Sequence, residues 1–254
     1  MSFSYDIIGS IAILKFSRET GNKKKKKIAL RLLKERKNIK TVLEKIERVK
    51  GRLRTYKTRF LVGIKTKETV HKESGCRFKL DVEKTYFSPR LSNERIEVAR
   101  KIKKGSKVLV LFSGVAPYSI IIAKLAKPKK VISVEINRKA CEYARENIKM
   151  NKLQDKIELI QGDVKKLKLK EKFDYVVMPR PQLKESFLKE AFKFSKKGTE
   201  IFYYDFGSDV DKILERIYFE SKKAGKKILI LRVKKAGEIA PYKYRWRIDL
   251  RVLN

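Results

Sequence analysis

Residues 108–135, VLVLFSGVAPYSIIIAKLAKPKKVISVE, contain two short aliphatic runs separated by a compact turn and a stretch with helical spacing. We predict a strand over Val108–Phe112, a helix over Tyr118–Leu125 and a second strand over Val131–Glu135. A helix between two apolar strands forms a βαβ unit, whose strands are parallel and whose crossover is right-handed. This segment therefore predicts an α/β fold with a largely parallel sheet.

Strands and helices continue to alternate on both sides of this unit. The expected helices are residues 93–102, 138–150, 183–194 and 210–224, and the further expected strands are residues 157–160, 175–178, 200–206, 227–233 and 245–252. The loop between the last two strands, with Gly237 and Pro241, is too short for a crossover helix, so the final strand should run antiparallel. We expect a doubly wound, Rossmann-like sheet closed by a C-terminal antiparallel hairpin, as in class I methyltransferases.

The first 86 residues follow a different pattern, which indicates a small α+β domain. The predicted elements are one bent strand over residues 4–16, a helix over 28–37 and strands over 40–46, 52–62 and 76–82. We expect the run Lys23–Lys27 to follow a turn as a solvated face, and His71 to lie in a loop. The predicted boundary separates residues 1–86 from residues 87–254.

The charge balance points to a polyanionic partner. The chain has 66 Lys and Arg against 29 Asp and Glu, for a formal net charge of +37. Such an excess attracts nucleic acid, although a thermophile's bias toward charged residues would explain part of the lysine content.

Scarce thiols and imidazoles exclude several classes of chemistry. Two cysteines cannot build a disulfide framework, and a single histidine argues against a structural zinc site and against Ser-His-Asp or Cys-His hydrolysis. No apolar run approaches the roughly 20 residues of a membrane span, and no basic signal sequence opens the chain. We expect a cytoplasmic monomer without a metal or a membrane anchor.

The ends of the expected strands predict a ligand site, because doubly wound sheets bind ligands where the strand order reverses. The turn Ser113–Pro117 follows the first strand, and Glu135 ends the next strand, where a carboxylate accepts hydrogen bonds from a ribose. Asp163 is positioned to hold an adenine amino group, or is an ordinary turn residue. Pro179-Arg180-Pro181 leaves carbonyl groups free to accept from a base, or is a rigid loop that merely ends a strand.

Several motifs in order resemble the tRNA (guanine-37-N1)-methyltransferases of archaea and eukaryotes. They are YDIIG at 5–9, GRLRT at 51–55, HKESGC at 71–76, YFSPRLSNER at 86–95 and FSGV at 112–115. The resemblance starts near the first residue, without the small N-terminal domain that many archaeal members carry. It implies an S-adenosylmethionine-dependent enzyme that binds the tRNA anticodon stem-loop at position 37, with residues 1–86 as the RNA-binding and positioning domain.

Three positions depart from the family pattern. Val110 replaces an acidic residue, Ala116 replaces a glycine, and Pro179-Arg180-Pro181 replaces Asn-Leu-Pro. The last form is similar to an archaeal subgroup that methylates both N1 of guanosine-37 and carbon 7 of 4-demethylwyosine in tRNA(Phe), giving isowyosine. The resemblance therefore implies both activities.

The resemblance also implies the site residues. The expected cofactor-binding residues are Phe112, Ser113, Gly114, Val115, Pro117, Glu135, Ile136, Asp163, Val164 and Met178, and the expected substrate-binding residues are Tyr86, Phe87, Pro179, Arg180 and Pro181. Tyr86 or Phe87 would stack on a flipped base, although aromatics at a domain junction are often core residues.

Three residues are expected to be catalytic. Glu94 matches the proposed general base, although a glutamate in the first helical turn is also favoured by the helix dipole. Arg54 matches the arginine placed against guanine O6. On an alternating strand, Arg52 and Arg54 would face the same way, and the alternative is an exposed basic strand that binds phosphates. Arg95 would hold the target phosphate or orient Glu94.

Two other functions fit the same sequence. A related transferase moves the aminocarboxypropyl group of the same cofactor onto the wyosine precursor. Val110 and Ala116 would also suit a non-catalytic RNA-binding protein with a decayed cofactor site.

Overall fold

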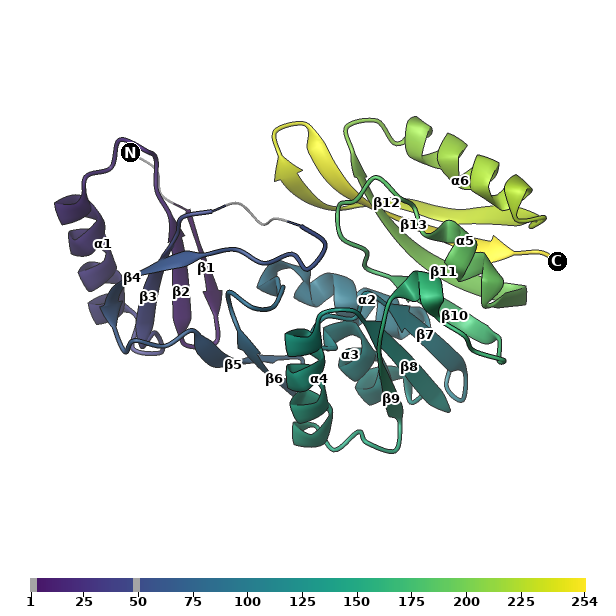
Figure 1. Cartoon of the computed structure of the whole chain (residues 1–254), viewed down its shortest axis with the longest axis horizontal. Helices are drawn as coiled ribbons and strands as arrows, with labels where there is room; N and C mark the ends of the chain where they lie inside the picture. Colours follow the sequence, from purple (N-terminus) through teal and green to yellow (C-terminus); the bar gives the residue numbers. More distant parts are fainter. Residues whose placement is uncertain (1–3, 48–50) are drawn as a thin grey trace.

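The structure, a computed structural model, describes residues 4–47 and 51–254 and has a small N-terminal part beside a larger α/β part (Figure 1). Its helices are α1 (Asn22–Glu35), α2 (Ser92–Lys101), α3 (Pro117–Ala126), α4 (Arg138–Met150), α5 (Leu188–Lys193) and α6 (Asp211–Lys223), with short 3-10 turns at Pro89–Leu91 and Val164–Lys166. Its strands are β1 (Ser4–Ile8), β2 (Ile11–Lys15), β3 (Thr41–Lys45), β4 (Thr58–Gly63), β5 (Glu68–Glu73), β6 (Cys76–Asp81), β7 (Lys107–Leu111), β8 (Lys130–Glu135), β9 (Ile157–Gln161), β10 (Phe173–Met178), β11 (Ser195–Gly207), β12 (Ile228–Ala240) and β13 (Lys243–Val252).

The larger part is built on a seven-stranded sheet in the order β12-β13-β11-β10-β7-β8-β9. Strands β7 to β11 pair in parallel, whereas β13 pairs antiparallel with both β11 and β12. The doubly wound sheet with a C-terminal antiparallel hairpin is therefore confirmed. The chain runs outward from β7 to β9 and then returns to place β10 on the other side of β7, so the strand order reverses between β7 and β10.

Both faces of the sheet are covered at β7, which explains the unbroken apolar run of that strand. Val108 and Val110 pack with α2, α3 and α4 on one face, while Leu109 and Leu111 pack with α5 and α6 on the other. A strand buried on both faces needs apolar residues at every position. None of the helices in the described residues combines the length and the hydrophobicity needed to span a bilayer.

The first strand of the small part differs from the prediction. Instead of one bent strand, β1 and β2 form an antiparallel hairpin with Ile8 opposite Ile11. Gly9 permits this turn, because its φ is +56° and a Cβ there would lie 2.3 Å from the Thr69 hydroxyl. The four-stranded sheet continues in the order β1-β2-β3-β4, and α1 is the crossover between the parallel strands β2 and β3.

The lysine run forms the first turns of α1 rather than a segment before it. Most of these lysines are exposed, as expected, but Lys25 is buried and donates to Glu44 of β3 at 2.8 Å. Arg59 of β4 contacts the other Glu44 oxygen at 2.6 Å. Burial of Lys25 is possible because a carboxylate of the sheet neutralises it.

Two other local predictions were wrong. The strand expected over residues 52–62 begins only at Thr58, because Gly51 and Arg54 adopt positive φ values of 65° and 59° in a turn. Arg52 and Arg54 therefore do not share one face of a strand. His71 lies in β5 rather than in a loop, and its Nδ1 accepts a hydrogen bond from the Gly9 amide at 3.1 Å.

The hairpin of β5 and β6 lies between the two parts. Its backbone at Lys79 exchanges two hydrogen bonds with the side chain of Asn147 in α4, at 2.6 and 3.0 Å. Its other strand, β5, meets the small part, where Thr69 accepts from the Ser10 amide at 2.9 Å. The expected domain boundary near residue 86 stays a prediction.

A buried cluster of charges fastens α2 to the C-terminal hairpin. Arg247 of β13 is fully buried and donates to Glu94 at 2.5 Å, Glu97 at 2.6 Å and Asp249 at 2.7 Å. Lys234 of β12 contacts both glutamates. The cluster compensates the buried charges of α2 and holds that helix against the sheet.

We predict that Arg247→Met lowers the free energy of unfolding by about 3–5 kcal/mol, because it leaves buried carboxylates without their main partner. Chemical denaturation measures this loss. The matched control is Arg251→Met on the same strand, whose ion pair with Glu200 is 44% exposed on the arginine side. Loss of a surface pair should cost less than about 1 kcal/mol, and equal losses in the two variants would contradict the prediction.

Candidate active site

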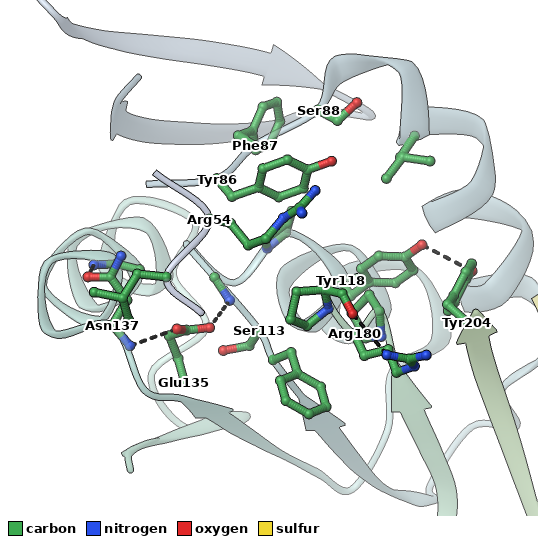
Figure 2. Close-up of a pocket in the computed structure, with 18 of the residues that line it drawn as sticks. Arg54, Tyr86, Phe87, Ser88, Ser113, Tyr118, Glu135, Asn137, Arg180 and Tyr204 are labelled. Carbon is green, nitrogen blue, oxygen red and sulfur yellow. Dashed lines mark hydrogen bonds between the residues drawn. The ribbon is translucent and has the colours of Figure 1, made fainter. Parts of the chain in front are cut away.

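A cleft lies beyond the carboxyl ends of β7 and β10, at the reversal of strand order (Figure 2). It encloses about 100 Å³ and is lined by segments from both parts of the chain. The small part contributes residues 52–54, and the larger part contributes the segment after β6, the turn after β7, the end of β8 and the loop after β10. The topology thus brings together motifs that are far apart in the sequence.

The turn after β7 and the end of β8 form one wall. Glu135 accepts from the Gly114 amide and from the Asn137 amide, each at 2.7 Å, as Figure 2 shows. Burial raises the pKa of this carboxyl above its usual value. The Ser113 hydroxyl is buried without a hydrogen-bond partner in the described residues. This wall therefore offers a carboxylate and a free hydroxyl to a ligand.

A smaller hollow adjoins the cleft and shares part of its wall. Phe112, Ile136 and Pro181 line both, and Asp163 and Val164 line the smaller one. The side chain of Asp163 accepts from the Lys165 amide at 3.0 Å and pairs with Arg52 at 2.8 Å. An elongated ligand could thus extend from the β7 turn to the segment after β9.

Two of the expected cofactor-binding residues lie in the core instead. The side chains of Val115 and Met178 are fully buried in the clusters on the two faces of the sheet. Neither lines the cleft, although Gly114, next to Val115, and Pro179, next to Met178, do. The family resemblance identified the right loops, but these two side chains pack in the core on either face of the sheet.

Arg54 packs against Tyr86 in the lining of the cleft (Figure 2). The Arg54 guanidinium lies 5.2 Å from the Tyr86 ring, and Arg245 of β13 donates to the Tyr86 hydroxyl at 3.2 Å. Burial disfavours the phenolate, but the guanidiniums of Arg245 and Arg54 outweigh it and lower the pKa of Tyr86. The Arg54 Nε is buried without a partner in the described residues. It therefore has a hydrogen bond left to donate.

Phe87 and Arg95 are packed more firmly. The ring of Phe87 lies 5.0 Å from that of His71 and is 8% exposed, so it belongs mostly to the core. The guanidinium of Arg95 lies 5.1 Å from that ring and donates two 2.6 Å hydrogen bonds to Glu73 of β5. Arg95 lines the cleft but pairs with Glu73 rather than Glu94, so it does not orient Glu94 by contact.

Glu94 lies behind the cleft wall rather than in it. Its carboxylate accepts from Tyr204 at 2.7 Å, Arg247 at 2.5 Å and Lys234 at 3.0 Å. Tyr204 itself lines the cleft, and so does Tyr118, whose hydroxyl donates to that of Tyr204 at 3.0 Å. Two phenol groups thus connect Glu94 with the cleft.

The loop after β10 is shaped by Arg180. This side chain is 2% exposed, pairs with Asp205 of β11 and donates to the carbonyls of Pro181 at 3.0 Å and Leu183 at 3.1 Å. The carbonyl of Pro181 was expected to be free for a base and is not. These contacts hold residues 179–183 as an ordered loop and replace the start of the helix expected from residue 183.

Several cleft residues were not predicted from the sequence. They are Leu53, Ser88, Leu91, Tyr118, Asn137, Ala140, Tyr204, Phe206 and Arg245, beside Arg52, for which phosphate binding was only the alternative interpretation. Tyr118 follows the β7 turn and Asn137 follows Glu135, so their positions in the motif were a usable signal. Tyr204, Phe206 and Arg245 come from the C-terminal strands, where no local pattern marks them.

Comparison with protein families gives matches along most of the chain. A family described as the TRM5/TYW2 methyltransferase domain matches residues 69–229, and one described as the TYW2 N-terminal domain matches residues 1–66. Together these matches cover both parts of the structure.

Three relatives illustrate the range of activities in similar proteins. The tRNA (guanine(37)-N(1))-methyltransferase Trm5b of Pyrococcus abyssi is 37% identical over 98% of this chain and 74% of its own length. A tRNA(Phe) (4-demethylwyosine(37)-C(7)) aminocarboxypropyltransferase of Methanocaldococcus jannaschii is 32% identical over 95% of this chain and 94% of its own. The tRNA (guanine(37)-N(1))/4-demethylwyosine(37)-methyltransferase Taw22 of Nanoarchaeum equitans is 30% identical over 97% of this chain and 99% of its own length.

Solved structures agree with these matches. Trm5b from Pyrococcus abyssi aligns with a TM-score of 0.90 at 37% identity, over 99% of this chain and 75% of that one. A complex of aTrm5 and tRNALeu aligns with a TM-score of 0.89 at 33% identity, over 99% of this chain and 72% of that one. TYW2 of Methanocaldococcus jannaschii with AdoMet aligns with a TM-score of 0.77 at 28% identity, over 99% of this chain and 100% of that one. The chain belongs to the TRM5/TYW2 methyltransferase family.

Proposed function

We propose that this protein transfers the methyl group of S-adenosylmethionine to N1 of the guanosine at tRNA position 37. The observation that carries the proposal is the cleft itself, which is lined by Arg54, with its unpartnered Nε, together with Glu135 and Ser113. The 37% identity to Trm5b of Pyrococcus abyssi supports the same reaction. The net charge of +37 suits a tRNA substrate.

The cleft fits the cofactor. The carboxylate of Glu135 suits the two hydroxyls of a ribose, and the free Ser113 hydroxyl offers a further polar contact. Asp163 lines the adjoining hollow, where it can accept from an adenine amino group. When bound, S-adenosylmethionine supplies an electrophilic methyl group. The solved complex of the related TYW2 with AdoMet supports this assignment.

The chain's own residues handle the charge on the purine. Removing the N1 proton of guanine moves negative charge onto O6, which needs a nearby cation. Arg54 is the candidate because its guanidinium lines the cleft and has a free Nε. Arg54 is also held in place, because it packs on the ring of Tyr86. Glu94 is the acceptor for the proton, reached through the cleft wall.

A second reaction, methyl transfer to carbon 7 of the tricyclic base 4-demethylwyosine in tRNA(Phe), is favoured by the loop after β10. Pro179 and Pro181 line the cleft where the family pattern has Asn-Leu-Pro, and a proline ring donates no hydrogen bond. The relative of Nanoarchaeum equitans, named for both methylations and 30% identical, supports this extension.

Aminocarboxypropyl transfer is the second candidate function. It is favoured by the match of residues 1–66 to the TYW2 N-terminal domain and by the aminocarboxypropyltransferase that is 32% identical. The two reactions leave different products, since methyl transfer yields S-adenosylhomocysteine and aminocarboxypropyl transfer yields methylthioadenosine.

Mass spectrometry of nucleosides and of spent cofactor tests the proposal. We expect tRNA with guanosine-37 to gain one methyl group at N1 and to release S-adenosylhomocysteine, while tRNA with adenosine-37 stays unmodified. Methylthioadenosine as the product would replace the proposal with aminocarboxypropyl transfer. If calorimetry shows no binding of S-adenosylmethionine, a non-catalytic RNA-binding role would follow.

We predict that Arg54→Lys lowers the single-turnover rate of N1 methylation about 100-fold or more. A lysine lacks the planar guanidinium that can pack on Tyr86 and at the same time donate to O6 of the guanine. The binding of S-adenosylmethionine should not change. Arg90→Lys is the matched control, since Arg90 lies outside the cleft in an exposed pair with Asp6. Equal effects of the two substitutions would contradict the role of Arg54.

We predict that Pro179→Asn changes the ratio of the two methylations in favour of guanosine, because the asparagine adds a hydrogen-bonding side chain to the wall that faces the base. Parallel assays with guanosine-37 and 4-demethylwyosine-37 tRNA(Phe) measure the ratio. Equal loss of both activities would argue against a specificity role for this loop.

A further inference from the structure

The polar groups that connect Glu94 with the cleft form an ordered chain. The Tyr118 hydroxyl donates to the Tyr204 hydroxyl at 3.0 Å, which donates to Glu94 Oε1 at 2.7 Å (Figure 2 shows the first contact). Both tyrosines line the cleft, and Glu94 does not. Every donor in this chain therefore points away from the cleft and toward the carboxylate.

Direct contact between Glu94 and a base in the cleft would require the buried charge cluster to open. Arg247, which is fully buried, and Lys234 contact the carboxylate from β13 and β12, and Tyr204 contacts it from β11. Releasing Glu94 would break its buried contact with Arg247 and leave the Tyr204 hydroxyl without its acceptor in a dry environment. A relay avoids that cost, because the carboxylate can receive a proton without moving.

We propose that Tyr118 and Tyr204 relay the purine proton from the cleft to Glu94, an inference that rests on the proposed methylation of N1. The N1 proton passes to the Tyr118 oxygen, the Tyr118 proton to the Tyr204 oxygen, and the Tyr204 proton to Glu94. The electron pair left on N1 forms the new bond to the methyl carbon, whose bond to sulfur breaks with its electrons staying on sulfur. Both phenols end neutral, and Glu94 ends protonated.

The surroundings of the phenols favour a concerted transfer. Burial raises the pKa of Tyr118 to about 12 and raises that of Tyr204 well above its usual value. Neither phenolate therefore persists as an intermediate, so each phenol must lose one proton as it gains another. The rings are fixed for this, since they meet edge to face with centroids 6.0 Å apart in the core.

The test is single-turnover methylation of guanosine-37 tRNA by Tyr204→Phe and by Tyr118→Phe. Each variant keeps its ring and loses only the hydroxyl, so we expect folding and S-adenosylmethionine binding to persist while the rate falls about 100-fold or more. The matched control is Tyr175→Phe, which removes a phenol from the same core cluster outside the cleft and should change the rate less than about 3-fold.

Two further readouts separate a relay from a structural role. Glu94→Gln combined with Tyr204→Phe should be no slower than Glu94→Gln alone, since residues that act as a unit are not additive. The wild type should show a curved dependence of rate on solvent deuterium fraction, and Tyr204→Phe should lose the curvature. The relay would be overturned if the rate losses of Glu94→Gln and Tyr204→Phe multiply in the double variant, or if both tyrosine variants react at near wild-type rates. Either result would leave the proposed methylation intact. A wild type that does not methylate guanosine-37 would overturn both.

Discussion

The reversal of strand order between β7 and β10 is the constraint on which the rest of the structure depends. The connections that follow the parallel strands β7 and β10 lead to opposite sides of the sheet. They leave a crevice at the carboxyl edge of these two strands, because no crossover helix covers that point. The turn at Gly114 and the loop at Pro179 meet there. Every other contribution to the cleft, from the small part and from the C-terminal strands, is arranged around this edge.

Buried charge organises the wall of the cleft. Arg247 and Lys234 compensate the carboxylates of α2, and Arg180 with Asp205 holds the loop after β10. Buried ion pairs add little net stability but strongly disfavour arrangements that separate the partners. In this protein they leave Glu94 behind the wall and Tyr204 in front of it. The same contacts that stabilise α2 thus decide how Glu94, the proposed proton acceptor, is connected with the cleft.

The small part completes the site rather than merely adjoining it. The turn of residues 51–54 carries Arg54 to the ring of Tyr86 and Arg52 to Asp163 after β9. Two arginines from one turn therefore reach both the cleft and its neighbouring hollow. The larger part by itself would lack Arg54, the cation proposed to face the purine.

The sequence by itself determined the winding of the larger part, the antiparallel final strand and the loops around Gly114, Glu135 and Pro179. Apolar periodicity and turn residues are local signals, and the chain's own spacing places them at strand ends. Only the tertiary structure decided that Val115 and Met178 are core residues, that Arg54 lies in a turn, and that Tyr204 and Arg245 belong to the cleft. These depend on which strands become neighbours and on which buried charges find partners, and both are set by contacts between residues far apart in the chain.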